Sequence, residues 1–214
     1  MQRYFHDELQ ELRNKLILLG EKSNEAARMA IESLLQSDIG KVDTVLALDD
    51  PIDDLEKEIG HACMRYISLR SPVSTDVRLI LVALKASHDF ERVGDEAHTI
   101  AKKAKDLLRR EGRLNEPLKF DAMSRLASDL LHDAITCFVE EDLEKAHAVI
   151  RMDREIDDLN NYHFETLSAE AMQGQLSDLT RFEAALISKS IERIGDHAKN
   201  LAEEVIFLLT GDAF

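Results

Sequence analysis

The chain is organised around one stretch of sequence that occurs twice. It reads ERVGDEAHTIAKKA at residues 91–104 and ERIGDHAKNLAEEV at residues 192–205. Glu, Arg, Gly, Asp and two alanines recur at the same places, and the second copy lies 101 residues after the first. Two chance matches of this quality in one chain are improbable, so the repeat indicates an internal duplication.

A second correspondence extends the duplication toward the start of each half. It has an offset of 104 residues, which differs from 101 because the connections between elements differ slightly in length. The matched positions are Ile31, Asp38, Lys41, Val45, Asp49, Asp53 and Leu55 in the first half, and Ile135, Asp142, Lys145, Val149, Asp153, Asp157 and Leu159 in the second.

Composition and apolar spacing predict an all-α fold. The chain has 8 Gly, 3 Pro and no Trp, and helix-forming residues abound. Apolar residues recur every three or four positions in six segments, which cover about residues 5–36, 38–70, 74–111, 120–140, 142–173 and 177–210. Asp38 and Asp142 are expected helix N-caps, and Pro51 predicts a kink or a break. We therefore expect a tandem repeat of two antiparallel three-helix bundles, residues 1–112 and 117–214, joined by the polar linker at residues 112–117.

The charge and the cysteines restrict the classes of function. A net charge of -15 argues against nucleic-acid binding, and it suits a basic partner, bound cations or simple solubility. No apolar run is long enough to span a membrane, and the first residues do not resemble a secretory signal. Cys63 and Cys137 lack metal-type spacing, so we expect free core thiols in a reducing cytoplasm.

Pairs of acidic residues mark the second and third helices of each half. Within each pair the residues are four apart, so both side chains lie on one side of a helix and repel one another unless a cation is near. If the two helices are neighbours, four carboxylates converge in each half and require protons or cations. Oxygen ligands suit Mg, Ca, Mn and Fe, with Zn also allowed. The alternative is that these acids are solvated or paired with basic residues. The candidate metal ligands are Asp49, Asp53, Glu91 and Asp95 in the first half, and Asp153, Asp157, Glu192 and Asp196 in the second.

Glycine and arginine recur within the duplicated stretch. Gly94 and Gly195 lie inside helices, where Gly costs about 1 kcal/mol relative to Ala. A close helix contact is the preferred explanation, and room for a ligand is the alternative. Arg92 and Arg193 are expected to form salt bridges within the bundle.

Two Glu-x-x-His pairs have the spacing used in ferritin-like di-iron bundles, namely Glu58 with His61 and Glu144 with His147. They do not correspond under the 104-residue offset, which argues against that type of site. His98 follows Asp95 by three residues and is a possible extra ligand. No glycine-rich phosphate loop and no nucleophile constellation stands out, so nothing in the sequence demands an enzyme.

The duplicated ERVGD and ERIGD motifs resemble the PhoU family of phosphate-uptake regulators. The resemblance covers essentially the whole chain, including FHDELQELRNKL at residues 5–16, SPVSTDVRLILVALK at 71–85 and LLTGDAF at 208–214. It implies two similar three-helix bundles and multinuclear iron or zinc clusters on the E/D-x-x-x-D motifs. Asp89 keeps the acidic residue that this family often has two positions before the motif Glu, but Ser190 does not. The second site is therefore expected to bind fewer ions, or none.

The resemblance also implies a role. We expect a non-enzymatic, cytoplasmic, homodimeric regulator that restrains phosphate uptake and phosphate-starvation signalling. Its expected partners are a membrane sensor histidine kinase and the ATPase of the phosphate ABC transporter. The alternative is a metal-dependent enzyme, either a ferritin-like di-iron oxidase or a hydrolase that uses clustered metals.

Overall fold

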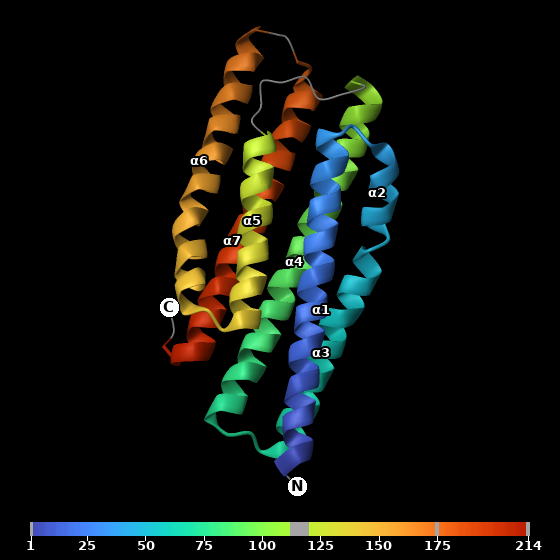
Figure 1. Ribbon diagram of the computed structural model, residues 1–214. Coiled ribbons are helices and arrows are strands. Elements are labelled where there is room, and N and C mark those ends of the chain that lie inside the picture. Colours follow the sequence, from blue (N-terminus) through green and yellow to red (C-terminus); the bar gives the residue numbers. More distant parts are fainter. Residues whose placement is uncertain (1, 112–119, 174–175, 213–214) are drawn as a thin grey trace.

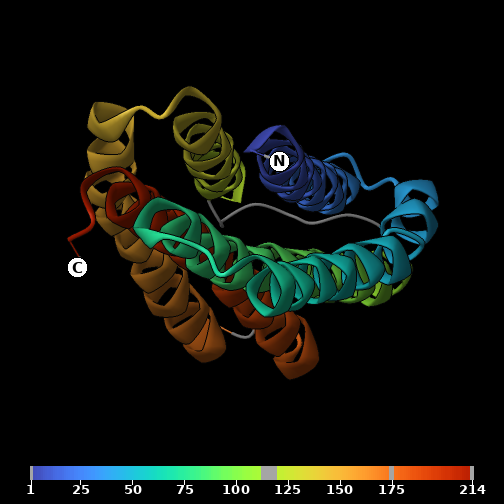
Figure 2. The ribbon, with the colours of Figure 1, turned by 90° about the horizontal axis from the view of Figure 1, so that it is seen from below.

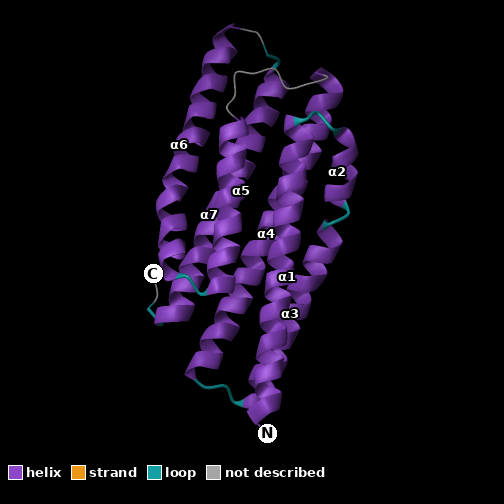
Figure 3. Ribbon diagram, in the orientation of Figure 1, coloured by secondary structure: helices purple, strands orange, loops and turns teal. Residues whose placement is uncertain are grey.

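The computed structural model describes residues 2–111, 120–173 and 176–212, and within these ranges the ordered elements are all α-helices (Figures 1 and 3). The helices are α1 (Gln2–Leu35), α2 (Ile39–Leu46), α3 (Asp49–Arg70), α4 (Ser74–Glu111), α5 (Phe120–Glu140), α6 (Leu143–Gln173) and α7 (Asp178–Thr210). The expected linker at residues 112–117 lies outside the described residues.

The helices form two three-helix units that lie side by side, which confirms the tandem bundle. Helix α3 packs against α1 and α4, and α6 packs against α5 and α7, so each outer helix contacts its own half. The halves meet where α4 lies along α7 and α1 contacts α5. Figure 2, seen along the bundle, places α4 and α7 between the outer helices. The third helices of the two repeats therefore form the spine of the molecule.

The described residues form seven helices instead of the six expected, because the second helix of the first half is divided. Helix α2 begins after Asp38, whose carboxylate accepts a hydrogen bond from the Gly40 N–H at 2.9 Å, and α3 begins at Asp49. Pro51, which has no N–H to donate, lies in the first turn of α3, where proline is tolerated. Glu155 occupies the corresponding place in the second half, and α6 runs unbroken through it. The break expected from Pro51 is confirmed.

Side-chain and glycine caps define the ends of the later helices. Asp142 accepts a hydrogen bond from the Lys145 N–H at 3.0 Å at the start of α6, and Ser177 accepts one from the Thr180 N–H at 3.1 Å at the start of α7. Gly211, with φ of 84°, ends α7 in the left-handed conformation that glycine adopts most easily. The expected cap at Asp142 is therefore present, and Ser177 is a further cap that the structure adds.

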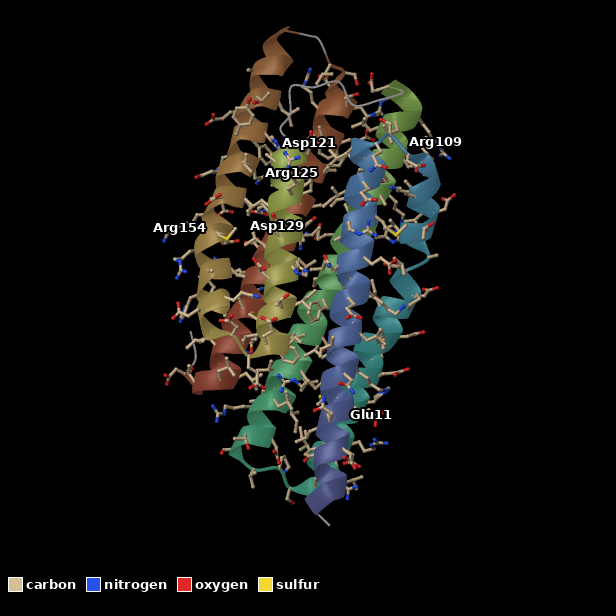
Figure 4. The ribbon with its side chains drawn as sticks, in the orientation of Figure 1. Glu11, Arg109, Asp121, Arg125, Asp129 and Arg154 are labelled. Atoms are coloured by element: carbon tan, nitrogen blue, oxygen red, sulfur yellow. The ribbon has the colours of Figure 1, made fainter. Side chains whose placement is uncertain are left out.

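The apolar stripes of the helices meet in one continuous core. Both cysteines are free and buried in it. Charged side chains such as Glu11, Arg109 and Arg154 stand on the outer surface (Figure 4). Among the described residues, no helix combines the length and the apolar character needed to cross a membrane.

Candidate metal centre

The repeated glycines bring the outer helix of each half close to the spine. A Cβ on Gly94 would lie 3.1 Å from Cδ1 of Ile52 on α3, and one on Gly195 would lie 3.0 Å from Cδ1 of Ile156 on α6. Ile52 and Ile156 are themselves matched by the 104-residue offset. The glycines therefore serve a close helix contact, as preferred from the sequence, and the acidic pairs flank that contact in both halves.

The carboxylates of the second half converge between α6 and α7. Asp157 on α6 and Glu192 and Asp196 on α7 each offer an oxygen, and these oxygens lie within 4.8 Å of one another. Burial is the main cause that raises the pKa of Glu192 and of Asp196, and repulsion from the neighbouring aspartates raises both further. Glu192 and Asp196 therefore lie where negative charge is disfavoured, which is the electrostatic condition for a cation site.

Asp153 adds a fourth carboxylate to this second-half set. Its side chain is 3% exposed, and its Oδ2 accepts a hydrogen bond from Lys199 Nζ at 2.9 Å. Its Oδ1 is buried without a hydrogen-bond partner, and its charge helps to raise the pKa of Asp196. A buried carboxylate oxygen without a partner is costly, so Oδ1 of Asp153 would gain from a cation nearby, although Asp153 is not among the three residues whose oxygens lie within 4.8 Å of one another.

The expected first-half set is dispersed over separate partners. Asp49 Oδ1 lies 3.2 Å from His98 Nδ1, and Asp53 Oδ2 lies 3.6 Å from Lys57 Nζ. Asp95 accepts a hydrogen bond from Arg92 at 2.8 Å.

Among the residues that the structure describes, Glu91 is the one first-half candidate that belongs to a close group of potential ligands, and its companions there are Glu56 on α3 and His88 on α4. His88 Nδ1 lies 3.4 Å from Glu56 Oε1 and 3.8 Å from Glu91 Oε2. Burial, and then repulsion from Asp95, raises the pKa of Glu91. Glu91 Oε2 is buried without a hydrogen bond, although Arg92 Nε lies 3.3 Å away.

Glu56 and His88 were not among the residues expected from the sequence. The signal that could have found them is the spacing of three residues, which puts His88 beside Glu91 on α4 and Glu56 beside Asp53 on α3. The duplication does not point to either residue, because neither has an acidic counterpart in the other repeat.

Both groups fit a metal ion by their donor chemistry. The second-half group offers oxygen alone, whereas the first-half group offers two carboxylates and an imidazole. Zn²⁺ accepts nitrogen and oxygen ligands, and all-oxygen sets suit harder ions. The Glu-x-x-His pairs are not gathered in this way in the described residues, and Glu58 is paired with Lys15 at 2.8 Å.

Arginine and histidine connect the two halves beside these groups. Arg193 reaches Glu96 on α4 at 2.8 Å, and His197 Nδ1 lies 2.9 Å from Asp89 Oδ1 on the same helix. Arg92 instead pairs along its own helix. The salt bridge within the bundle expected of Arg92 is present, but the one expected of Arg193 is wrong, because Arg193 pairs with the other repeat.

Comparisons with known proteins agree with this architecture. The family model described as PhoU domain matches residues 16–104 and 120–205. A relative from Thermotoga maritima named phosphate-specific transport system accessory protein PhoU homolog 1 is 33% identical over 92% of this chain and 83% of its own. One from Clostridium acetobutylicum, named as a homolog of the same accessory protein, is 30% identical over 98% of this chain and 95% of its own.

Solved structures extend the likeness to three dimensions. The crystal structure of PhoU from Pseudomonas aeruginosa superposes with a TM-score of 0.92 at 29% identity, over 97% of this chain and 100% of that one. The phosphate transport system regulatory protein PhoU from Streptococcus pneumoniae superposes with a TM-score of 0.88 at 26% identity, over 98% of this chain and 99% of that one. The duplicated motifs, the paired bundles and these matches together place the chain in the PhoU family.

Proposed function

We propose that this chain is a regulatory accessory protein of phosphate-specific transport that acts by protein contacts in the cytoplasm and is not an enzyme. The names of its relatives support the accessory role. We further propose that it works as a homodimer, that it restrains phosphate uptake and starvation signalling, and that its partners are a sensor histidine kinase and the transporter's ATPase. The acidic surface expected from a net charge of -15 suits partners with basic patches.

The observation that carries the proposal is the group of largely buried carboxylates between α6 and α7, with a more exposed group between α3 and α4 in the first half. In the second half Asp157, Glu192 and Asp196 would hold a divalent cation such as iron or zinc, with Mg or Mn as further candidates. More than one ion in a set is consistent with the number of bridging carboxylates. The bound ion supplies positive charge that lets these carboxylates remain ionised together.

The residues of the chain then determine what such an ion does to the surface. The contact between Gly195 and Ile156 holds α6 and α7 at a fixed spacing, and the carboxylates reach across it from both helices. Because Asp157 lies on α6 and Glu192 and Asp196 lie on α7, these residues would hold an ion between the two helices, and binding it would restrict the rotation of α6 and the outer face that α6 would present to a partner. Partner binding thereby becomes sensitive to metal.

Elemental analysis of the untagged protein, purified without chelator, tests the metal part of the proposal. The matched comparison is a variant with Glu91, Asp95, Glu192 and Asp196 all changed to Ala. We expect iron or zinc in the parent, and its absence from a variant that keeps its helical circular dichroism.

A phosphate-responsive reporter in cells that lack the parent chain tests the regulatory part. The parent is expected to repress the reporter in high phosphate, and the metal-free variant is expected to repress it less. Equal repression by both proteins would remove metal from the mechanism, and failure of the parent to repress would refute the regulatory role. An oxygen-uptake assay with ferrous iron and a phosphatase assay with manganese check that the protein lacks the alternative enzymatic activities.

A further inference from the structure

The two halves differ at two matched positions beside their carboxylates. Under the 101-residue offset that aligns the third helices, His88 corresponds to Lys189 and His98 corresponds to Lys199. The first half therefore has two imidazoles where the second half has two ammonium groups.

The matched side chains make equivalent contacts in the two halves. His98 Nδ1 lies 3.2 Å from Asp49, and Lys199 Nζ lies 2.9 Å from Asp153, the residue that matches Asp49. The correspondence is therefore a structural one as well as one of sequence.

The other matched pair repeats this pattern on the motif glutamates. His88 Nδ1 lies 3.8 Å from Glu91, whereas Lys189 Nζ lies 2.5 Å from both carboxylate oxygens of Glu192. Each carboxylate set is thus flanked by a basic side chain on its outer-helix aspartate and by another on its motif glutamate.

These two kinds of basic group act oppositely toward a metal. An imidazole nitrogen has a lone pair and is a common metal ligand. An ammonium group donates three hydrogen bonds, has no lone pair, and carries a compact positive charge that repels a second cation. Lys189 therefore occupies both carboxylate oxygens of Glu192 as an internal cation, and Lys199 occupies one oxygen of the neighbouring Asp153.

A third matched position adds to the difference. Glu56, a member of the first-half group, corresponds to Asn160 under the 104-residue offset. Asn160 is buried, and its Oδ1 accepts a hydrogen bond from Ser188 at 2.8 Å. The second half thus lacks the counterparts of both Glu56 and His88 as ligands.

In the first half, Arg92 is the one lysine or arginine that pairs with a member of the Glu56, His88 and Glu91 group among the ion pairs of the described residues. Arg92 contacts Glu91 and Asp95 from a side chain that is 43% exposed. Its counterpart Arg193 is turned away to Glu96. Glu56 and His88 remain unoccupied by any lysine or arginine among the ion pairs of the described residues.

We propose that the two repeats have separate roles toward metal: Glu56, His88 and Glu91 form the tighter site for a nitrogen-accepting divalent cation of the zinc type, and Lys189 and Lys199 weaken metal binding in the second half. This assignment rests on the proposed function only in that the proposed function also has metal bound at the carboxylate sets, and it gives each half a different affinity and donor set.

Reciprocal exchange of the matched residues tests this division. Zn²⁺ is titrated against a chromophoric chelator, with the untagged full chain, for the parent, His88→Lys/His98→Lys, and Lys189→His/Lys199→His. We expect the first variant to lose about tenfold or more in affinity at the tight site, and the second to gain about tenfold or more at a second site. The visible absorption of bound Co²⁺ reports whether a nitrogen ligand is present, and it should change in the first variant.

The controls separate a lost ligand from a damaged fold. His132→Lys, at an exposed position on α5, adds a lysine elsewhere and should bind Zn²⁺ as the parent does, and circular dichroism checks the helices of every variant. The gain expected in the Lys→His variant does not depend on a destabilising change, so misfolding cannot imitate it.

Two outcomes overturn the proposal. One is a tight site that survives His88→Lys/His98→Lys but is lost in Glu192→Gln/Asp196→Asn. The other is no Zn²⁺ bound by the parent or by Lys189→His/Lys199→His. If the titrations follow the expectation while the phosphate reporter is indifferent to these variants, the division of metal binding stands and the regulatory role of metal fails.

Discussion

Replacing Gly195 by Ala tests whether the spacing of the spine and the outer helix depends on the missing side chain. The new Cβ would lie 3.0 Å from both Cδ1 and Cγ2 of Ile156, and 3.7 Å from Cδ1 of Leu130. Carbon atoms in contact prefer about 3.5 to 4.0 Å, so Ile156 must shift by roughly half an ångström against a core without spare room.

The magnitude follows from two opposing contributions. Overpacking of a close-packed core costs about 1 to 3 kcal/mol, while Ala in place of Gly inside a helix stabilises by about 0.5 to 1 kcal/mol. The net effect is a loss of roughly 1 kcal/mol in the free energy of unfolding, which lowers Tm by about 2 to 4 °C for a chain of this size. Gly94→Ala should behave similarly, because Ile52 meets its Cβ at 3.1 and 3.2 Å.

Gly60→Ala is the matched control. Gly60 lies inside α3, and a Cβ there would meet no atom within 4 Å. This variant should therefore be more stable than the parent by about 0.5 to 1 kcal/mol. Urea unfolding followed by far-ultraviolet circular dichroism, in chelator, measures all three variants. If Gly195→Ala is stabilised as much as Gly60→Ala, the packing explanation of the repeated glycine is wrong.

Three further outcomes are expected. Lys199→Met leaves the buried Asp153 without its cation and should lower the free energy of unfolding in chelator by about 2 to 3 kcal/mol. The loss should stay below the largest values known for such pairs because the Lys199 side chain is 35% exposed. An unchanged midpoint of urea unfolding would contradict this. The pKa values of Glu192 and Asp196 are raised in the folded state, so above about pH 4 the folded state binds more protons than the unfolded state. The free energy of unfolding of the parent, measured in chelator, should therefore fall relative to that of Glu192→Gln/Asp196→Asn as the pH rises from about 4 to 7. A difference that stays constant over this pH series would count against the burial of these charges. Burial raises the pKa of the Cys63 thiol to about 11 and that of Cys137 to about 12, so neither should react with a thiol reagent at pH 8 until the chain is unfolded by urea; rapid labelling of the native protein would show that the core is open.

The bundle could be predicted from the sequence because each of its determinants is local. Spacings of three and four residues fix which face of a helix is apolar, and Asp38 and Asp142 accept hydrogen bonds within three residues of themselves. Pro51 divides its helix through its own missing N–H. The duplication then indicated that whatever packs in one half packs in the other.

The carboxylate groups depended on information that is not local. Glu91 meets Glu56 rather than Asp53, because the rotation of α3 about its axis is set by the contact of Ile52 with Gly94. Arg193 was expected to form a salt bridge within its own bundle and pairs with Glu96 on α4 instead. The sequence of a single repeat does not determine how the two repeats pack against each other. The repeated sequence predicted that the two halves have the same backbone fold. The partners of the side chains differ between the halves because they depend on residues that the two repeats do not share.

The divided helix gives the two halves different mechanical stiffness. Asp49 begins α3 just beyond the turn at residues 47–48, where Leu48 N–H bonds to Val45 in a tight 3.0 Å turn and Pro51 offers no N–H. Asp153 and Asp157 instead project from the interior of α6, a continuous 31-residue helix. A force on the first turn of α3 is therefore taken up by the turn at residues 47–48, whereas the same force on α6 is transmitted along the continuous helix to both of its ends.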